Sequence, residues 1–238
     1  FTSYTDDQLC AQLAGWAHRD GCRFVKMKIG SESERDPRRA LSAKAAIGDC
    51  QLFVDANGAF SVTAALAFAA AAEAADIRWF EEPVSSDDLP GLRLMRQEAP
   101  KQMDIAAGEY IYTADDARRL LEFDVVDVLQ ADVTRCGGIS GFLQIGALCE
   151  AHHIDLSGHC APALHRHVAC SVPRFVTSNG FMTTCALSKC CLRVRRQPAT
   201  AQLSQIWIGP ATVLCSRKRM PSVFSWMGTH HETQGRGR

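Results

Sequence analysis

The stretch that decides the fold is Ile77-Arg78-Trp79-Phe80-Glu81, a short apolar run that ends in a carboxylate. Similar β-branched or apolar runs, each ending at or near a polar residue, occupy residues 24–29, 51–55, 104–109, 125–132 and 154–157. Amphipathic or Ala-rich stretches separate them, including residues 6–19, 37–46, 61–74, 113–122 and 141–152. Alternation of strands with helices predicts an α/β fold with a parallel sheet.

The polar residues at the strand ends recur at a regular interval. They are Lys28, Asp55, Glu81, Glu109, Asp132 and His159. Their separations of 27, 26, 28, 23 and 27 residues each match one strand-helix unit. In a closed (β/α)₈ TIM-type barrel the C-terminal ends of all strands meet at one mouth, so these side chains would converge. An open doubly wound sheet would spread them along an edge and would usually carry a Gly-rich turn after its first strand, which this sequence lacks.

Three of these strand ends carry carboxylates, namely Asp55, Glu81 and Glu109. Three carboxylates at one mouth would repel one another, and a hard divalent cation removes that repulsion. All-oxygen ligation favours Mg²⁺, so the three are predicted metal ligands. The alternative is that each acid caps a helix or pairs with a surface arginine.

The first strand carries Lys26 and Lys28, which share one face because strand side chains alternate. If this face points into the barrel, one of the two lysines could act as a general base, since burial and a cationic neighbour lower the pKa of a lysine. The alternative is a solvated edge strand. Asp132 and His159 could form a dyad in which the carboxylate orients the imidazole, although a single loop histidine is often structural.

A competing set of metal ligands lies between residues 149 and 167. It comprises Cys149, His152, His153, His159, Cys160, His165 and His167. Their spacing matches no zinc module, and adjacent residues point in different directions, so zinc is the minor hypothesis.

Composition excludes several classes of protein. The 238 residues contain 26 Lys and Arg against 26 Asp and Glu, a balance that argues against nucleic-acid and membrane-surface partners. No apolar run reaches the roughly 18 residues of a membrane span. The polar start resembles no signal peptide, and the 11 cysteines are odd in number and irregular in spacing, which favours a cytoplasmic location over a secreted disulfide framework.

These motifs resemble the enolase superfamily, specifically the mandelate racemase and muconate lactonizing enzyme-like subgroup of acid-sugar dehydratases and racemases. The similarity covers residues 1–175. It is carried by residues 25–30, 54–59, 79–83, 107–109, 132–139 and 157–162. The resemblance implies that Asp55, Glu81 and Glu109 bind Mg²⁺, and that Lys28 acts as base with Lys26 tuning it. It also implies that the Asp132–His159 dyad acts from the opposite face of the substrate.

The resemblance implies abstraction of the proton α to a carboxylate, followed by dehydration of a sugar acid. A racemase or epimerase is the alternative within the same class, because Lys28 and His159 on opposite faces also permit two-base exchange. A catalytically dead remnant and a phosphate-binding barrel enzyme are alternatives from other classes. The expected partner is a small sugar acid, and the full-length parent is expected to be a homo-oligomer.

Both ends of the chain depart from the family pattern. The resemblance implies that a capping domain and a first barrel strand are absent, so residues 1–175 form a partial barrel domain. Over residues 176–238 the hydrophobic periodicity disappears. Restoring one nucleotide after the Phe175 codon permits family-like peptides over residues 176–192 and 205–225. We therefore expect an out-of-frame tail that does not complete the barrel and lacks the acidic tip of the last strand.

Overall fold

Parallel strands in sequence order build the central sheet. The computed structural model describes residues 4–178 and 192–193. The sheet has the order β1-β2-β3-β4-β5-β6-β7-β8, and its first seven strands are parallel. They are β1 (Phe24–Lys28), β2 (Gln51–Asp55), β3 (Ile77–Glu81), β4 (Asp104–Ala107), β5 (Val128–Ala131), β6 (Asp155–Gly158) and β7 (Phe175–Ser178).

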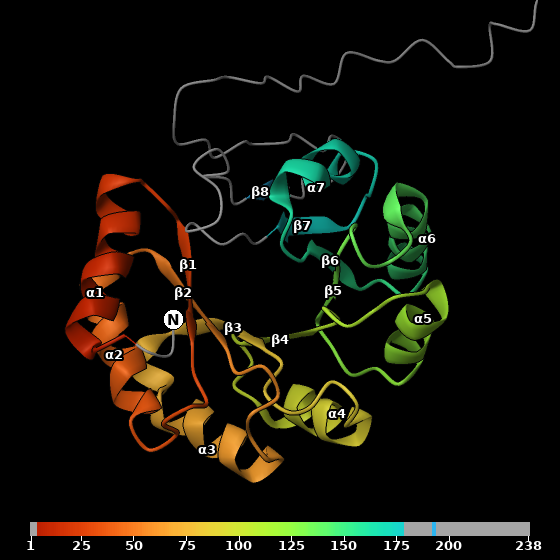
Figure 1. The fold of residues 1–238 in the computed structure, drawn as a ribbon. Helices are drawn as coiled ribbons and strands as arrows, with labels where there is room; N and C mark the ends of the chain where they lie inside the picture. Colours follow the sequence, from red (N-terminus) through yellow and green to blue (C-terminus); the bar gives the residue numbers. More distant parts are fainter. Residues whose placement is uncertain (1–3, 179–191, 194–238) are drawn as a thin grey trace, which may run out of the picture.

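Helix α1 precedes β1, one helix follows each of the strands β1 to β6, and the helices cover the outside of the curled sheet (Figure 1). They are α1 (Asp6–Ala14), α2 (Asp36–Ile47), α3 (Val62–Ala71), α4 (Leu89–Glu98), α5 (Ala114–Glu122), α6 (Gly138–Ala151) and α7 (Pro162–Ala169). A π-turn (Gly15–Arg19) extends α1, and a 3₁₀ turn (Glu73–Ala75) follows α3. This is the predicted α/β architecture, an incomplete TIM-type barrel.

The two faces of the sheet are both apolar, but they pack against different parts of the protein. Outward residues such as Val54, Phe80 and Ile105 are fully buried and join the helices in one large core cluster. Inward residues form a second, smaller cluster around Trp79, Ala106 and Val128. Because side chains alternate along a strand, one sequence run supplies both clusters.

A layer of aromatic rings lies directly beneath the polar strand ends. Phe24 packs on Phe53 at a ring-centroid distance of 5.5 Å, and Phe53 stacks on Trp79 at 5.3 Å. The residues two positions further along β1, β2 and β3 are Lys26, Asp55 and Glu81. Their side chains therefore share the inner face with these rings and lie nearer the C-terminal mouth of the barrel.

The structure adds elements to the predicted pattern and shortens others. Helix α4 was not among the expected helical stretches, because its first turn contains Pro90 and Gly91. Proline is tolerated there because the first N–H groups of a helix have no partner within the helix, and the Asp88 side chain accepts from the N–H of Gly91. Strand β4 ends at Ala107, two residues earlier than predicted, so Glu109 belongs to a loop.

The predicted boundary at residue 175 falls inside the sheet. Strand β7 runs from Phe175 to Ser178, and β8 (Leu192–Arg193) pairs with it in the antiparallel sense. The sheet therefore continues past the predicted boundary through these two short segments. An eighth barrel strand would be parallel, however, so β8 covers the edge of β7 without continuing the barrel pattern. The rest of the predicted tail, residues 179–191 and 194–238, lies outside the described residues.

Across the described residues, the helices are too short or too polar to cross a membrane.

Replacing Phe80 with alanine should lower the free energy of unfolding by about 3–5 kcal/mol. Phe80 is fully buried and packs edge-on against Phe60 and Phe68, so its removal leaves a cavity between β3 and α3. Phe123→Ala is the matched control, because Phe123 is 48% exposed. Urea denaturation followed by circular dichroism measures both variants, and equal losses would contradict this placement of the core.

Candidate active site

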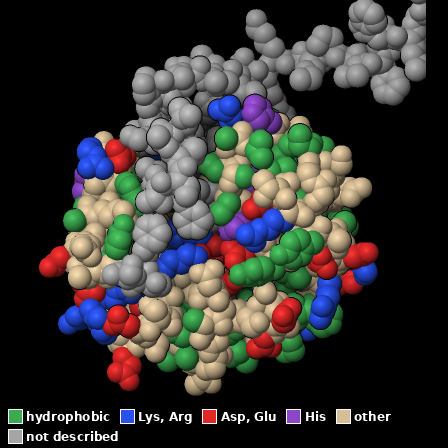
Figure 2. All heavy atoms as spheres, viewed as in Figure 1, with side chains coloured by type: hydrophobic (Ala, Val, Ile, Leu, Met, Phe, Trp, Pro, Cys, Tyr) green, Lys and Arg blue, Asp and Glu red, His purple; other side chains and the backbone are tan. Residues whose placement is uncertain are grey.

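Three neighbouring strands end side by side at the mouth of the barrel. Lys28 pairs in register with Asp55, and Asp55 pairs with Glu81. Each is the last residue of its strand, as the sequence predicts. Figure 2 looks onto this mouth and shows acidic, basic and histidine side chains gathered near the centre of the face. The parallel register therefore brings together side chains about 27 residues apart in sequence.

Lys26 forms the centre of a buried ion cluster. Its Nζ lies 2.5 Å from both carboxylate oxygens of Glu81 and 3.1 Å from Oδ2 of Asp55. Burial opposes the charge on Lys26, but the two carboxylates outweigh burial and hold the pKa of the ammonium above its usual range. Trp79 from the aromatic layer donates its indole N–H to Glu81 at 3.0 Å. Both lysine and tryptophan thus fix the orientation of the Glu81 carboxylate.

The two carboxyl groups that share Lys26 have opposite pKa shifts. Burial raises the pKa of Asp55, but Lys26 and Lys28 outweigh burial and lower it to about 2. Burial raises the pKa of Glu81, and the neighbouring Asp55 adds to that rise against the attraction of Lys26. Asp55 is therefore the firmly ionised member of the pair.

Lys28 lies at the solvent-facing end of this cluster, with 24% of its side chain exposed. Its Nζ lies 2.5 Å from Oδ2 of Asp55 and 2.5 Å from the side-chain oxygen of Asn57. Asn57 adopts a positive φ of 45°, and its N–H donates to the other Asp55 oxygen at 3.0 Å. The end of β2 and the turn that follows it therefore hold both partners of Lys28. Asn57 lies within the motif at residues 54–59, but the sequence assigned it no role.

Glu109 reaches the mouth through a glycine. Gly108 has φ +129°, and a Cβ there would lie 2.3 Å from the backbone oxygen of Gln130 on β5. Only glycine permits that close approach, which turns the chain after β4. The Glu109 carboxylate then lies 2.7 Å from Nε2 of His159, and Arg135 donates to the backbone oxygen of Glu109 at 2.7 Å.

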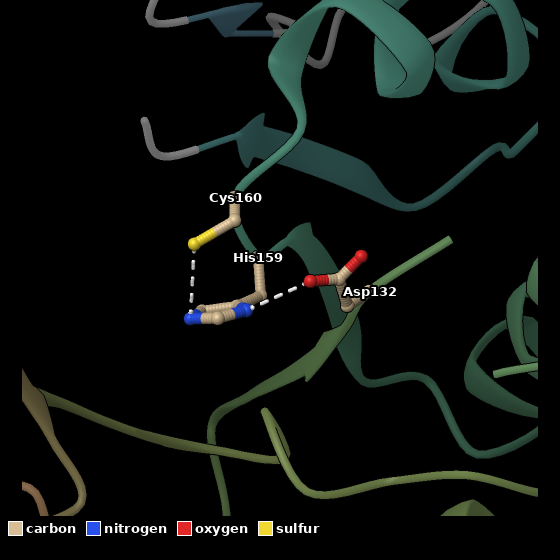
Figure 3. Close-up of side chains that lie close together, drawn as sticks. All are labelled: Asp132, His159 and Cys160. Atoms are coloured by element: carbon tan, nitrogen blue, oxygen red, sulfur yellow. Dashed lines mark hydrogen bonds and ion pairs between the residues drawn. The ribbon is translucent and has the colours of Figure 1, made fainter. Parts of the chain in front are cut away.

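The predicted Asp132–His159 dyad is present. Nδ1 of His159 lies 3.1 Å from Oδ2 of Asp132 (Figure 3). The other oxygen of Asp132 accepts from the N–H and hydroxyl of Thr134 at 2.8 and 2.6 Å, which fixes the carboxylate. Burial lowers the pKa of His159, but its contacts with Cys160 and Glu109 outweigh burial and raise the pKa to about 10. The imidazole is therefore cationic at neutral pH.

Glu82 is a buried acid that the sequence analysis left as a neighbour of Glu81. It has a positive φ of 42° and is 1% exposed, and among the described residues its Oε1 has no hydrogen-bond partner. Burial, reinforced by the charges of Glu109, Asp55 and Glu81, raises its pKa to about 8. In the sequence, only the adjacent pair Glu81-Glu82 indicated a second carboxyl group at this position.

The donor set at this mouth fits a hard divalent cation. Asp55, Glu81 and Glu109 offer only oxygen atoms, and the pKa of Glu82 is raised by the charges of all three. The three carboxylates do not form a group within 4.8 Å; among the described residues that group is Asp132, His159 and Cys160. Lys26 instead contacts Asp55 and Glu81, while His159 contacts Glu109.

The seven candidate zinc ligands between residues 149 and 167 do not all lie in one site. His152, His153 and His167 are exposed, whereas Cys149 and His165 are buried. His165 has a structural role, because its Nε2 accepts from the N–H of Val133 at 3.1 Å and its Nδ1 contacts the Cys160 carbonyl at 2.8 Å. These side chains therefore lie in different environments.

The Glu82→Gln substitution should flatten the dependence of stability on pH. The pKa of Glu82 rises from 4.5 to about 8 on folding, so the native chain binds this proton more tightly than the unfolded chain. Native stability therefore falls as pH rises from 4.5 to 8, by about 4 kcal/mol in total. Urea titrations at several pH values in EDTA measure this slope, and an identical slope in the variant would refute the assignment.

Comparison with known proteins places this geometry in a family context. The family described as enolase C-terminal domain-like matches residues 8–187. A 3,6-anhydro-alpha-L-galactonate cycloisomerase of Streptomyces coelicolor is 32% identical over 166 residues, which cover 68% of this chain and 45% of that protein. Other similar proteins are named as sugar-acid dehydratases, a galactarolactone cycloisomerase and a dipeptide epimerase.

Solved structures agree with the fold. A mandelate racemase/muconate lactonizing enzyme-like protein from Rubrobacter xylanophilus is 48% identical, with a TM-score of 0.72, over 76% of this chain and 50% of that one. An L-talarate dehydratase from Polaromonas, complexed with Mg and L-glucarate, is 28% identical, with a TM-score of 0.70, over 76% of this chain and 50% of that one. The chain thus spans about half the length of these similar proteins.

Proposed function

Because this chain belongs to the enolase C-terminal domain-like family, we propose that it forms the barrel part of an enzyme that removes the proton next to the carboxylate of a sugar acid. The overall reaction we propose is dehydration. The observation that carries the proposal is the placement of two proton-transfer groups, Lys28 at the end of β1 and His159 directly after β6, around one acidic mouth.

Asp55, Glu81 and Glu109 are the residues that would hold Mg²⁺. The chemistry of the donor set supports this assignment, and a racemase structure similar to this chain contains magnesium. When bound, the cation supplies positive charge that stabilises the negative charge developing on the substrate carboxylate. The layer of aromatic rings, which includes Phe53 and Trp79, lies directly beneath the mouth of the barrel and limits the water around the reacting atoms.

Lys28 is the proposed base. In its neutral form its amine takes the proton from the α-carbon, and the electron pair of that C–H bond stays on the substrate. Asp55 and Asn57 hold Nζ at a fixed position, each at 2.5 Å. Lys26 is the proposed tuning residue, because its cation lies beside the same Asp55 oxygen at 3.1 Å and competes for that negative charge.

His159 is the proposed acid. As an imidazolium it gives the proton on Nε2 to the β-hydroxyl group, whose C–O bond breaks so that water leaves. The electron pair from the α-carbon completes the new C=C bond. Asp132 at Nδ1 keeps the ring oriented and stabilises its charged form. Asp132 is thus a positioning residue in this proposal.

Epimerisation is the second candidate. Lys28 ends β1 and His159 follows β6, and strands β2 to β5 lie between these two strands in the sheet. The two side chains can therefore approach a substrate from different sides. One group would then remove the α-proton while the other returns a proton to the opposite face. A substrate without a β-hydroxyl group permits only this second outcome, which distinguishes the two reactions.

Titration with Mg²⁺ in a calorimeter tests the proposal apart from turnover. We expect one Mg²⁺ site, with an affinity that falls at least about tenfold in Asp55→Asn because a charged ligand is lost. Asp115→Asn is the control, since its side chain is 87% exposed on α5. Equal Mg²⁺ affinity in the wild-type chain and Asp55→Asn would overturn the metal assignment.

A further inference from the structure

Arg135 is a cation at the rim of the mouth that has no close carboxylate partner among the described residues. It lies in the loop between β5 and α6, and 36% of its side chain is exposed. Its one described acidic contact is Asp132, with 3.8 Å between Nε and Oδ2, and that oxygen already lies 3.1 Å from Nδ1 of His159. Lys26 and Lys28, by contrast, each have a carboxylate oxygen at 2.5 Å. The charge of Arg135 is thus largely available to a ligand.

Two neighbours hold the guanidinium group of Arg135 in place. Its Nη1 donates to the backbone oxygen of Glu109 at 2.7 Å, and its Cζ lies 5.9 Å from the centre of the Tyr110 ring. The face of an aromatic ring attracts a cation at this distance. Arginine carries five N–H donors, and the hydrogen bond to Glu109 uses one of them. The group is therefore oriented and keeps donors for a ligand.

The proposed reaction sets the direction of the substrate across the mouth. The reacting carboxylate lies at the metal ligands, the α-carbon faces Lys28, and the β-hydroxyl group contacts His159. The carbons beyond the β-carbon therefore continue past His159 toward the rim. Arg135 lies on that side, because it follows β5 and shares the Asp132 carboxylate with the imidazole. The far end of the substrate thus meets an exposed guanidinium group.

We propose that Arg135 is a specificity-determining residue that binds the distal carboxylate of a sugar diacid. This inference rests on the proposed function, and it narrows the substrate class to hexarates over hexonates. A guanidinium group offers a carboxylate two parallel, charge-assisted hydrogen bonds, whereas the terminal hydroxyl group of a hexonate is a single neutral acceptor. The discrimination arises in binding and leaves the proton transfers at Lys28 and His159 unchanged.

Calorimetric titration of the full chain with galactarate and with galactonate, both in Mg²⁺, tests this assignment. The two acids differ only at C6, where the first has a carboxylate and the second has a hydroxymethyl group. We expect galactarate to bind about 10–100-fold more tightly, the range for hydrogen bonds to a charged group. Arg135→Gln should remove most of that preference and leave the affinity for galactonate within about twofold. Arg135→Lys keeps the charge without the paired donors and should recover part of the preference.

The matched control is Arg93→Gln, which changes an exposed arginine of α4 and should leave both affinities unchanged. Equal affinity for the two acids in the wild-type chain would overturn the inference. An equal loss of both affinities in Arg135→Gln would also overturn it, because the residue would then only hold the loop of Glu109. Binding is measured apart from turnover. A preference for galactarate that depends on Arg135, in a chain without α-proton exchange, would support this inference and contradict the proposed function.

Discussion

The His159→Asn and Lys28→Ala substitutions should each reduce turnover of a sugar acid by a hundredfold or more. A positioned general acid or base contributes typically about 10²–10⁴-fold to a proton-transfer step. His159 is buried between Glu109 and Asp132, and Lys28 is held by Asp55 and Asn57. Turnover is measured by proton NMR as the conversion of a sugar acid to its dehydrated product in the presence of Mg²⁺.

The controls for this experiment carry the same chemical change elsewhere on the chain. His167→Asn and Lys101→Ala alter exposed residues of α7 and of the turn after α4. Both should retain the wild-type rate. A near-normal rate in His159→Asn or in Lys28→Ala would remove that residue from the mechanism.

Replacing Lys26 with methionine should destabilise the metal-free chain by about 3–5 kcal/mol, the cost of removing one partner of a buried ion pair. Methionine fills a similar volume but leaves the buried carboxylates of Asp55 and Glu81 without their shared cation. The deficit should shrink at low pH, because protonation of these acids removes the uncompensated charge. Urea denaturation in EDTA measures it.

A double substitution isolates the electrostatic part of that effect. Adding Glu81→Gln to Lys26→Met removes one of the two stranded charges, so the double variant should be more stable than the sum of the two single changes predicts. Saturating Mg²⁺ should restore part of the lost stability, since an ion that binds only the native chain stabilises it. Additive losses that are insensitive to Mg²⁺ would contradict the assigned role of Lys26.

Much of the fold could be predicted because the spacing of the polar strand-end residues in the sequence matches the length of one strand-helix unit of the barrel. The interval between Asp55 and Glu81 is one strand, one helix and two loops, and the register pairs the two residues directly. Family membership and the incomplete barrel are confirmed. The roles of the individual site residues stay predictions. The end of β4 was harder to predict from the sequence, because the turn at Gly108 depends on its close approach to the backbone of Gln130.

Other parts of the site depend on tertiary contacts that a sequence pattern does not encode. The environment of Glu82 results from its positive φ and from the charges of Asp55 on β2, of the adjacent Glu81 on β3 and of Glu109 in the loop after β4. The position of Cys160 against Nε2 follows from the turn after β6, where Cys160 itself has a positive φ of 51°. Asn57 contacts Lys28 for the same reason, since it lies in a left-handed turn. Residues of this kind become visible only after the loops are placed.

Deuterium uptake at the α-carbon of a sugar acid tests the central claim most directly. The chain is incubated in D₂O with a panel of hexarates and hexonates, with Mg²⁺ or with EDTA, and the α-proton signal is followed by NMR. The account predicts loss of that signal for at least one acid, dependent on Mg²⁺ and abolished in Lys28→Ala. Exchange that persists in EDTA, or no exchange with any acid in a chain shown to bind Mg²⁺, would contradict it.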